Sequence, residues 1–423
     1  MTSDSGHKDR LSQSHPNKWP IVRLSEVVDI LTGFPFKGES YSKSGIRVVR
    51  GENISEGFLR WDSDKRWRFP IAELDSYLLK ESDVVIGMDG SKVGHNKCMI
   101  DREDLPLLFA QRVARLRSKE SLDQTYLYYN ILSNRFLRYV ESIKTGTSIP
   151  HVSSRQILNF EIPLPTVEEQ REIAHLFSSL DSKIKLNQKM NETLESIAQA
   201  IFKHWLIDFE FPNEDGKPYK SSGGEMVDSE LGEIPKGWKI MNLDEIAYNL
   251  DSKRIPLSNR EREARKGGFP YFGATGILDY VNDYLFDGVH ILMGEDGSVL
   301  NEDGHPILQY VWGKFWVNNH AHVLRGKIVS NELLYLFLRG TKVSHIVTGA
   351  VQQKINQKNM NKLKFQIPSN KTQSLMENFL AQIFEKIRLN FEQNKGLSQI
   401  RDLLLPKLMT GKIRVALEEK ENE

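Results

Sequence analysis

The 423-residue chain contains a single cysteine, Cys98, which excludes an internal disulfide and any cysteine-based metal cluster. Its apolar runs are far shorter than the ~18 residues that a membrane-spanning helix needs. The Ser/His/Lys-rich start also lacks the apolar segment of a secretion signal. We therefore expect a cytoplasmic protein without membrane contact, and the length predicts two or more domains.

The chain also has little net charge, only +1. Residues 19–160 hold 21 Lys and Arg against 18 Asp and Glu, and residues 236–366 hold 17 against 13. Between them, residues 208–235 hold 2 against 8. The near-neutral total therefore combines two weakly basic segments and one acidic segment. Excesses this small favour DNA binding only slightly over an ordinary protein surface.

Nucleotide-binding motifs are missing as well, because the sequence has neither a Gly-x-x-x-x-Gly-Lys-Ser/Thr loop nor a Gly-x-Gly-x-x-Gly fingerprint. One cluster is similar to a nuclease metal site: the segment 318–322, which contains His320 and His322, with Glu295 and Asp296 upstream. Histidines two apart on a strand point to opposite faces, so they do not readily hold one ion. We therefore expect a strand-edge or DNA-facing role and no metal site.

The chain does contain the same heptad pattern twice, 203 residues apart. Nine of ten positions keep their class, apolar or asparagine, and Arg401 is the exception. The first copy is Ile173, Phe177, Leu180, Ile184, Asn187, Asn191, Leu194, Ala198, Ile201 and Trp205, and the second is Met376, Leu380, Ile383, Ile387, Asn390, Asn394, Leu397, Arg401, Leu404 and Leu408.

Asparagines at the centre of each seam indicate that the two helices are partners. A buried amide without a hydrogen-bond partner costs roughly 1–3 kcal/mol. Two helices that place their amides opposite each other recover this loss in one register only. Asn187, Asn191, Asn390 and Asn394 are therefore predicted to set the register of the pair. Their central position fits a parallel or an antiparallel pairing, and the alternative is two unrelated amphipathic helices on separate cores.

The repeat extends into the segments before each helix. The pattern Gly-x-Asp-Gly-Ser at 87–91 returns at 294–298, and Thr145-Gly146 returns as Thr348-Gly349. Short apolar runs alternate with Gly, Asp and Ser clusters in both segments, which predicts mixed α+β domains, the first with a helix from Tyr126 to Val140. The framework is repeated while the loops differ, as expected of two domains that share a scaffold and recognise different things.

Four segments resemble a known family, the specificity subunit of Type I restriction-modification systems, over nearly the whole chain. They are residues 50–54, the proline-rich segment 162–170, residues 226–238 and residues 271–276. The resemblance implies an α+β fold in which two mixed α/β target recognition domains are joined by two long helices. These helices would form an antiparallel intramolecular coiled coil with a pseudo-two-fold internal repeat, and each domain would read one half of a split double-stranded DNA sequence.

The expected order is an arm (1–18), the first recognition domain (19–163), the central helix (164–207), a linker (208–235), the second recognition domain (236–368), the C-terminal helix (369–412) and a tail (413–423). Thr166 is expected to cap the first helix, and Gly411 to end the second. We expect the arm to be disordered and the linker to be exposed, although tethered in places.

The resemblance also implies partners: two modification subunits that methylate adenine with S-adenosylmethionine, and restriction subunits that translocate and cut DNA with ATP and magnesium. It implies no chemistry and no cofactor in this chain. The outer helix faces, including Glu195, Lys203 and His204, are where we expect modification subunits to dock. The alternatives are an autonomous metal-dependent nuclease with duplicated domains and a protein-binding scaffold.

Polar loop residues are the candidates for DNA contact, because sequence readout needs side chains that hydrogen-bond to base edges. For each candidate the alternative to DNA contact is an ordinary solvent-exposed position in a turn. The candidates are Arg50, Asn53, Lys92, Asn96, Lys97, Arg112, Thr145, Thr147 and Ser148 in the first domain, and Lys253, Arg254, Thr275, Asn319, His320, Gln352, Gln353 and Lys354 in the second.

Overall fold

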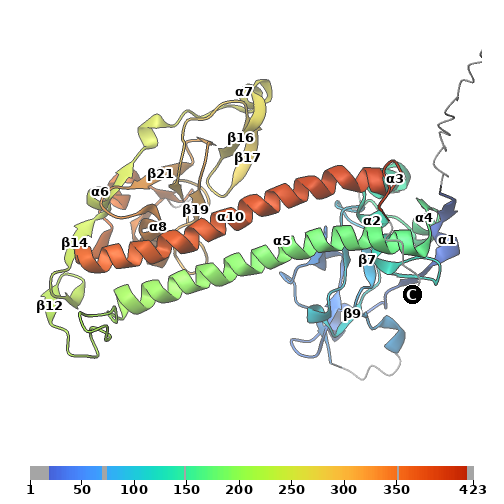
Figure 1. Ribbon diagram of the computed structural model, residues 1–423, viewed down its shortest axis with the longest axis horizontal. Coiled ribbons are helices and arrows are strands. Elements are labelled where there is room, and N and C mark those ends of the chain that lie inside the picture. The colour runs from blue at the N-terminus through green and yellow to red at the C-terminus, as the bar shows by residue number, and fades with distance from the viewer. Residues whose placement is uncertain (1–18, 69–73, 147–148, 350–351, 417–423) are drawn as a thin grey trace, which may run out of the picture. The chain divides into compact units, whose positions relative to one another are not determined.

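Short apolar runs, among them residues 84–86 and 291–293, form central strands of both halves of the chain. Figure 1 shows the computed structural model as a ribbon. The described residues are 19–68, 74–146, 149–349 and 352–416, so the expected arm, Thr147, Ser148 and most of the tail lie outside them. The chain divides into unit 1, residues 1–186 with 393–423, and unit 2, residues 187–392. Each unit contains one mixed domain and part of both long helices.

Unit 1 is built on a four-stranded antiparallel sheet in the order β2-β10-β7-β8. Val84, Val85 and Ile86 of β7 are fully buried, as expected of a strand covered on both faces. Its elements are β1 (Ile21–Arg23), α1 (Leu24–Val27), β2 (Val28–Thr32), η1 (Gly38–Ser40), β3 (Ile46–Val49), η2 (Gly51–Asn53), β4 (Ile54–Ser55), β5 (Phe58–Leu59), β6 (Arg66–Trp67), η3 (Asp75–Tyr77), β7 (Val84–Gly87), β8 (Lys97–Met99), η4 (Arg102–Asp104), β9 (Leu107–Phe109), β10 (Val113–Ser118), α2 (Gln124–Leu132), α3 (Asn134–Ile143), α4 (Ser154–Leu158) and β11 (Glu161–Pro163).

The single helix expected from Tyr126 to Val140 is wrong, because the structure has two helices that meet at Ser133. The Ser133 hydroxyl accepts a hydrogen bond from the Phe136 amide and donates one to the Asn130 carbonyl. The hydroxyl thus bonds to one backbone N–H and one backbone carbonyl, which a continuous helix would satisfy with its own backbone. A local side-chain cap therefore ends α2 and starts α3.

Unit 2 repeats this design around the sheet β15-β21-β18-β19. In both units a second sheet contains a parallel pair, β3 with β9 and β16 with β20. Its elements are β12 (Met226–Ser229), β13 (Gly232–Pro235), β14 (Lys239–Asn242), α6 (Leu243–Ile246), β15 (Ala247–Asn249), η6 (Asp251–Lys253), α7 (Asn259–Ala264), β16 (Lys266–Phe272), β17 (Ile277–Val281), β18 (His290–Gly294), β19 (Leu308–Val311), β20 (Trp316–Val317), β21 (Ala321–Gly326), α8 (Asn331–Gly340), η7 (Ser344–Ile346), β22 (Val347–Thr348), β23 (Lys354–Ile355), α9 (Gln357–Met360) and β24 (Lys364–Ile367).

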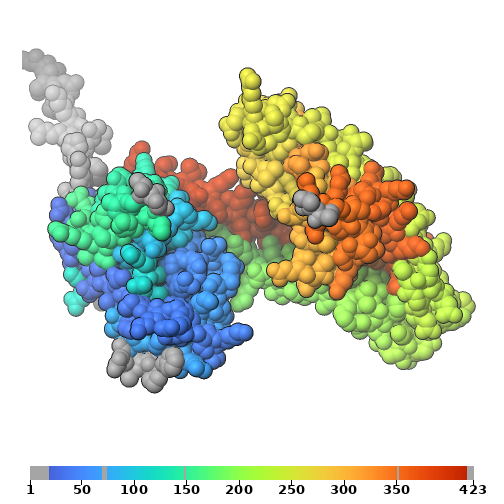
Figure 2. All heavy atoms as spheres, turned by 180° about the vertical axis from the view of Figure 1, so that it is seen from behind, coloured from blue at the N-terminus to red at the C-terminus, as the bar shows by residue number. Residues whose placement is uncertain are grey.

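The expected linker is folded onto unit 2. It contains the hairpin β12–β13, and Phe209, Phe211 and Ile234 are buried in the core of this unit. The rings of Phe209 and Phe211 lie 5.5 and 5.3 Å from that of Trp238. Elsewhere in unit 2, α7 and the β16–β17 hairpin, yellow in Figure 2, project from the rest of the unit.

The two long helices are α5 (Val167–Phe202), which continues into a π-helical turn η5 (Lys203–Ile207), and α10 (Asn370–Leu408). The Thr166 hydroxyl accepts from the Glu169 amide at 3.3 Å, as expected of a cap, and Gly411 follows α10 with a φ of +68°. Among the described residues, none of the helices combines the length and hydrophobicity that a bilayer crossing requires.

The helices run antiparallel within each unit. In unit 1, Asn394 donates to the Ile184 carbonyl and Arg401 to the carboxylate of Asp181. The ion pair explains why arginine is tolerated in an otherwise apolar seam. In unit 2, Asn390 contacts Asn191, and the rings of Phe379 and Trp205 lie 5.9 Å apart. Higher residue numbers on α5 thus meet lower numbers on α10, which settles the direction that the sequence left open.

Candidate nucleic-acid interface

The loops that differ between the two halves meet at one place in each unit. In unit 1 they are residues 50–53, 88–92, 110–112 and 149–152, here called platform 1. The Met88 amide donates to the Arg112 carbonyl at 2.8 Å, and the Gly90 amide to the Pro150 carbonyl at 3.0 Å. These backbone bonds join three loops that are far apart in the sequence.

Platform 2 consists of residues 273–276, 295–298, 318–320 and 352–355 of unit 2. The Glu295 amide donates to the His320 carbonyl at 2.9 Å, and the Gly297 amide to the Gln353 carbonyl at 3.0 Å. These bonds repeat those of platform 1 at equivalent positions. The repeated glycine, Gly90 or Gly297, has a φ of +95° or +78°, which accounts for glycine at this point of the motif.

Each platform carries an aspartate next to an exposed basic side chain. Arg112 Nε lies 3.8 Å from Asp89 Oδ2, and His320 Nδ1 lies 2.5 Å from Asp296 Oδ1. Arg112 has a φ of +73°, a conformation that non-glycine residues adopt uncommonly. Both aspartates belong to the repeated Gly-x-Asp-Gly-Ser motif, and this repeat was the one signal in the sequence. Their pairing with Arg112 and His320 was not predicted.

Platform 1 borders a concavity of about 580 Å³. Phe36 and Tyr41 supply aromatic surface, while Arg50, Lys92 and Arg112 supply positive charge. Burial raises the pKa of Tyr41, and the nearby Arg50 only partly opposes this effect. Glu52, which pairs with Arg50, and Asp89 also line the concavity, so its excess of positive charge is small. Charged, polar and aromatic walls together suit a nucleic-acid ligand better than an apolar small molecule.

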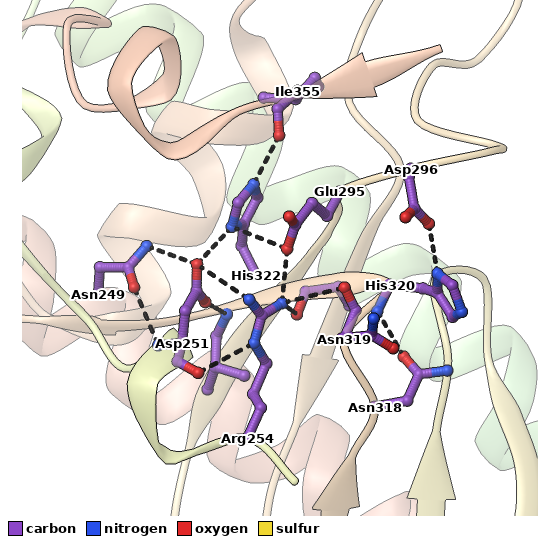
Figure 3. A network of polar contacts seen from close by, with 12 residues as sticks. Asn249, Asp251, Arg254, Glu295, Asp296, Asn318, Asn319, His320, His322 and Ile355 are labelled. Atoms are coloured by element: carbon purple, nitrogen blue, oxygen red, sulfur yellow. Dashed lines mark hydrogen bonds and ion pairs between the residues drawn. The ribbon is translucent and has the colours of Figure 1, made fainter. Parts of the chain in front are cut away.

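Platform 2 lies beside a network of largely buried charged side chains (Figure 3). Arg254 Nη1 lies 2.7 Å from Glu295 Oε2, and His322 Nδ1 lies 2.6 Å from Asp251 Oδ2. His322 Nε2 also bonds to the Ile355 carbonyl at 2.8 Å. Burial raises the pKa of Asp251, but the hydrogen bond and charge of His322, with other contacts, outweigh it and hold the pKa below its usual range.

Three of these groups, Asp251, Glu295 and His322, are close enough together to hold a metal ion. The guanidinium of Arg254 already bonds to Glu295, and Lys354 Nζ lies 3.2 Å from the same carboxylate. A divalent cation would meet these two positive charges, so the donor set fits an ion network better than a metal centre. His320 bonds to Asp296 instead of joining this group, which confirms that the two histidines diverge.

The candidate DNA-contacting residues differ in exposure. Arg50 and Asn96 are half-buried at the concavity of platform 1, whereas Thr147 and Ser148 are not described. The exposed candidates are Lys92, Arg112, Thr145, Lys253, Thr275, Asn319, His320, Gln352, Gln353 and Lys354.

Three candidates are corrected because their side chains are used inside the protein. Asn53 is buried; its amide oxygen accepts from the Arg50 amide, and its nitrogen donates to two carbonyls of the next loop. Lys97 is fully buried 3.6 Å from Glu56, and its burial lowers the pKa of the ammonium. Arg254 belongs to the ion network. These residues support the loops and are not placed to read bases.

A duplicated α+β scaffold with matched polar platforms and paired helices defines a two-domain recognition protein. Residues 16–196 and 235–399 match the family described as Type I restriction modification DNA specificity domain, and the chain belongs to that family. Its members are the non-catalytic, DNA-recognising specificity subunits of Type I restriction-modification complexes, and the catalytic activities lie in partner subunits. The assignment favours this function over an autonomous nuclease or a protein-binding scaffold.

Curated relatives of the chain include two specificity subunits from Methanocaldococcus jannaschii. The chain is 28% identical over 330 residues to the Type I restriction enzyme MjaIX specificity subunit, covering 73% of this chain and 74% of that protein. It is 31% identical over 192 residues to the MjaVIII specificity subunit, covering 44% and 45%. The crystal structure of a Type I S subunit from M. genitalium shares the fold, with a TM-score of 0.61 and 17% identity over 94% of this chain and 98% of that one.

Proposed function

We propose that platform 1 and platform 2 each read one half of a split double-stranded DNA target. The observation that carries this proposal is the repetition of one loop framework with different exposed side chains. Equivalent backbone bonds join Met88 to Arg112 and Glu295 to His320, yet the side chains presented to a ligand differ. A shared scaffold with different polar loops suits two readers of different sequences.

In this proposal the paired helices set the spacing between the half-sites. The helices pair in one antiparallel direction in each unit, and asparagines on one helix bond to the other. The complex would contain two modification subunits, which methylate adenine with S-adenosylmethionine, and restriction subunits that use ATP and magnesium. This chain would bind none of these cofactors, and the complex would act on cytoplasmic DNA.

Exposed apolar side chains on the long helices are the proposed docking surface for the modification subunits. Glu195 and Lys203, expected to serve this role, pair within unit 2 with Arg339 and Asp208. Apolar groups are better candidates because covering them removes hydrophobic surface from water. Among the described residues of α5 and α10, the most exposed large apolar side chains are Leu186, Ile400 and Leu403 in unit 1, and Phe379, Leu389 and Phe391 in unit 2.

Methylome sequencing of a host that carries this chain with its modification subunits tests the proposal. We expect one methylated adenine motif in two specific parts separated by a spacer of fixed length. Gel shifts with the motif should weaken steeply with salt, because binding to phosphates releases counterions. If the complex assembles but methylates a continuous motif, the proposal that two separate domains each read one half of the target is wrong.

A further inference from the structure

We infer that Arg112 and His320 hold the same base-reading position in the two half-sites, oriented by Asp89 and Asp296, and that Arg112 recognises a guanine. The inference rests on the proposed function and adds which side chains determine specificity. Its first support is the duplication itself: a basic group paired with an aspartate occurs on both platforms although the surrounding loops differ.

The strand register shows that the two positions are equivalent. Val113, which follows Arg112, pairs with Gly87 across β10 and β7. Ala321, which follows His320, pairs with Gly294 across β21 and β18. Arg112 and His320 therefore leave their sheets at the same step of the ladder. The framework thus brings one basic side chain to the equivalent position of each platform, although Arg112 has a positive φ and His320 does not.

The exposed fractions of the four side chains fit a base-contacting group that is held by a more buried carboxylate. The side chains of Arg112 and His320 are 63% and 49% exposed, whereas those of Asp89 and Asp296 are 33% and 18% exposed. The carboxylates are thus more covered than the groups that they contact. A partner of this kind restricts the rotation of the side chain and leaves its outer hydrogen-bonding groups available to a ligand.

The local backbone also favours a functional role for Arg112. Its positive φ of +73° suits glycine better than arginine. Strained residues of this kind persist where the surrounding structure holds them, and they cluster at binding sites. Arg112 also lines the concavity of platform 1 together with Arg50 and Lys92. Lys92 is exposed there and supplies charge for a phosphate beside the group that we assign to a base, whereas Arg50 pairs with Glu52.

The chemistry of the two groups predicts different degrees of discrimination. A guanidinium donates two parallel hydrogen bonds to O6 and N7 of guanine in the major groove, which distinguishes this base from the others. His320 has Nδ1 on Asp296, so its ring offers a base only Nε2. We therefore expect stronger discrimination at the Arg112 position than at the His320 position.

Methylomes of hosts carrying the whole complex with single variants test the inference. Arg112→Gly removes the side chain and suits the positive φ, so the loop should keep its fold. We expect the preference of the complex for guanine at one position of the first half-site to fall by roughly ten- to a hundredfold. The second half-site should stay unchanged. His320→Ala should relax one position of the second half-site only, and by a smaller factor.

Asp89→Asn tests positioning, because it removes the charge and keeps a side chain of the same size. We expect a partial loss of preference at the same guanine, and no further loss when Asp89→Asn is added to Arg112→Gly. If Asp89 only stabilised the fold, Asp89→Asn would instead lower methylation of all target sequences by the same factor and leave the preference for guanine unchanged. The control Arg138→Gln, exposed on α3 and outside platform 1, should leave the motif unchanged.

The results separate the inference from the function on which it rests. If the wild-type complex methylates a two-part motif and Arg112→Gly leaves every position of it unchanged, the assignment of Arg112 is overturned and the proposed function stands. Relaxation at a base other than guanine would overturn the guanine assignment. If the assembled wild-type complex methylates no two-part motif, the proposed function fails first.

Discussion

The amide nitrogen of Asn390 donates to the amide oxygen of Asn191 at 2.8 Å, across the two long helices within unit 2. Asn191 in turn donates to the Ile387 carbonyl at 3.3 Å. In unit 1, Asn394 donates to the Ile184 carbonyl at 3.2 Å. Both units therefore satisfy amides of the seam through the opposite helix, which is how a polar step in an apolar interface selects one alignment.

Replacing Asn390 with leucine should destabilise the helix pair. Asn390 is buried, and Asn191, which is partly buried, would lose a hydrogen bond. We expect a loss of about 1–3 kcal/mol, the usual cost of an unsatisfied buried polar group. Chemical denaturation of the purified chain, monitored by circular dichroism, measures this change.

The double variant Asn191→Leu with Asn390→Leu serves as the matched control. Replacing both partners with apolar groups removes the unsatisfied amide, so we expect stability to return to at least the wild-type value. Register specificity should weaken in unit 2, because the Asn191–Asn390 pair no longer distinguishes one alignment from its neighbours, while the bond from Asn394 to the Ile184 carbonyl remains in unit 1. A double variant less stable than the single one would show that these amides do not act as a pair.

The ion network of platform 2 predicts a dependence of stability on pH. The pKa of Asp251 is lowered in the folded state, so its stabilising contribution is present above its ordinary pKa of about 4 and disappears as the pH falls through the lower folded value. Asp251→Asn should cost about 3–5 kcal/mol at pH 7, as does breaking other buried ion pairs. As the pH falls below about 4, the free energy of unfolding of the variant should decrease less than that of the wild type.

Thermal unfolding from pH 7 to pH 2.5 provides the measurement. Asp303→Asn is a suitable control, because this aspartate is exposed in unit 2 and lies outside the network, so its replacement should leave the pH dependence unchanged. If Asp251→Asn unfolds with the same pH dependence as wild type, Asp251 does not contribute in the way that its contacts indicate.

The long helices and the duplication were predictable because their patterns are local and repeated. A 203-residue offset with matched asparagines indicates a partnered pair, and the resemblance indicates the antiparallel direction. The division at Ser133 was missed because an apolar pattern continues across it, while the cap depends on one hydroxyl. Local periodicity therefore predicts that helices exist better than it predicts where they end.

The candidate site was only partly predictable, because burial of a charged side chain depends on distant residues. Lys97 and Arg254 were taken for surface groups, the usual place of lysine and arginine. Their burial depends on Glu56 and Glu295, which lie 41 residues away in each case. The contact between Asp251 and His322 spans 71 residues. No local pattern predicts such contacts, whereas the repeated Gly-x-Asp-Gly-Ser motif does mark the centre of each platform.

Lys92 and Lys97 should respond differently to loss of charge. Lys92 is exposed on platform 1, so we expect Lys92→Gln to weaken binding to all sequences alike. Loss of one phosphate contact should reduce the slope of log affinity against log salt by about 0.9. Lys97→Met should leave this slope unchanged because Lys97 is buried. Affinity for duplex DNA measured at several salt concentrations tests both, and equal slopes for wild type and Lys92→Gln would exclude a phosphate contact.

Exposed leucines on α10 should be needed for partner binding but not for folding. Leu389 and Leu403 are 58% and 65% exposed, so replacing either with serine should change stability by no more than about 0.5 kcal/mol. We expect both variants to retain less modification subunit in co-purification. Leu231→Ser, exposed at the β12–β13 turn and outside the helices, is the control. Full retention by both helix variants would place the docking surface elsewhere.

Lengthening the helices tests their proposed role in half-site spacing. Seven residues add about 10.5 Å of helix, close to the length of three base pairs of DNA at about 3.4 Å each. An insertion into α5 alone shifts one seam against the other. Pairing such as that of Asn191 with Asn390 and of Ile184 with Asn394 then cannot form in both units at once. We therefore expect this variant to lose assembly.

A matched insertion of one heptad into both α5 and α10 preserves every seam position and should restore assembly. The preferred spacer between the half-sites should then lengthen by about three base pairs, because the added helix moves the readers apart. Binding to a series of duplexes that differ only in spacer length measures this preference. If the matched variant assembles and still prefers the wild-type spacer, the helices do not determine the spacing, and the separation of the half-sites must be set by the partner subunits.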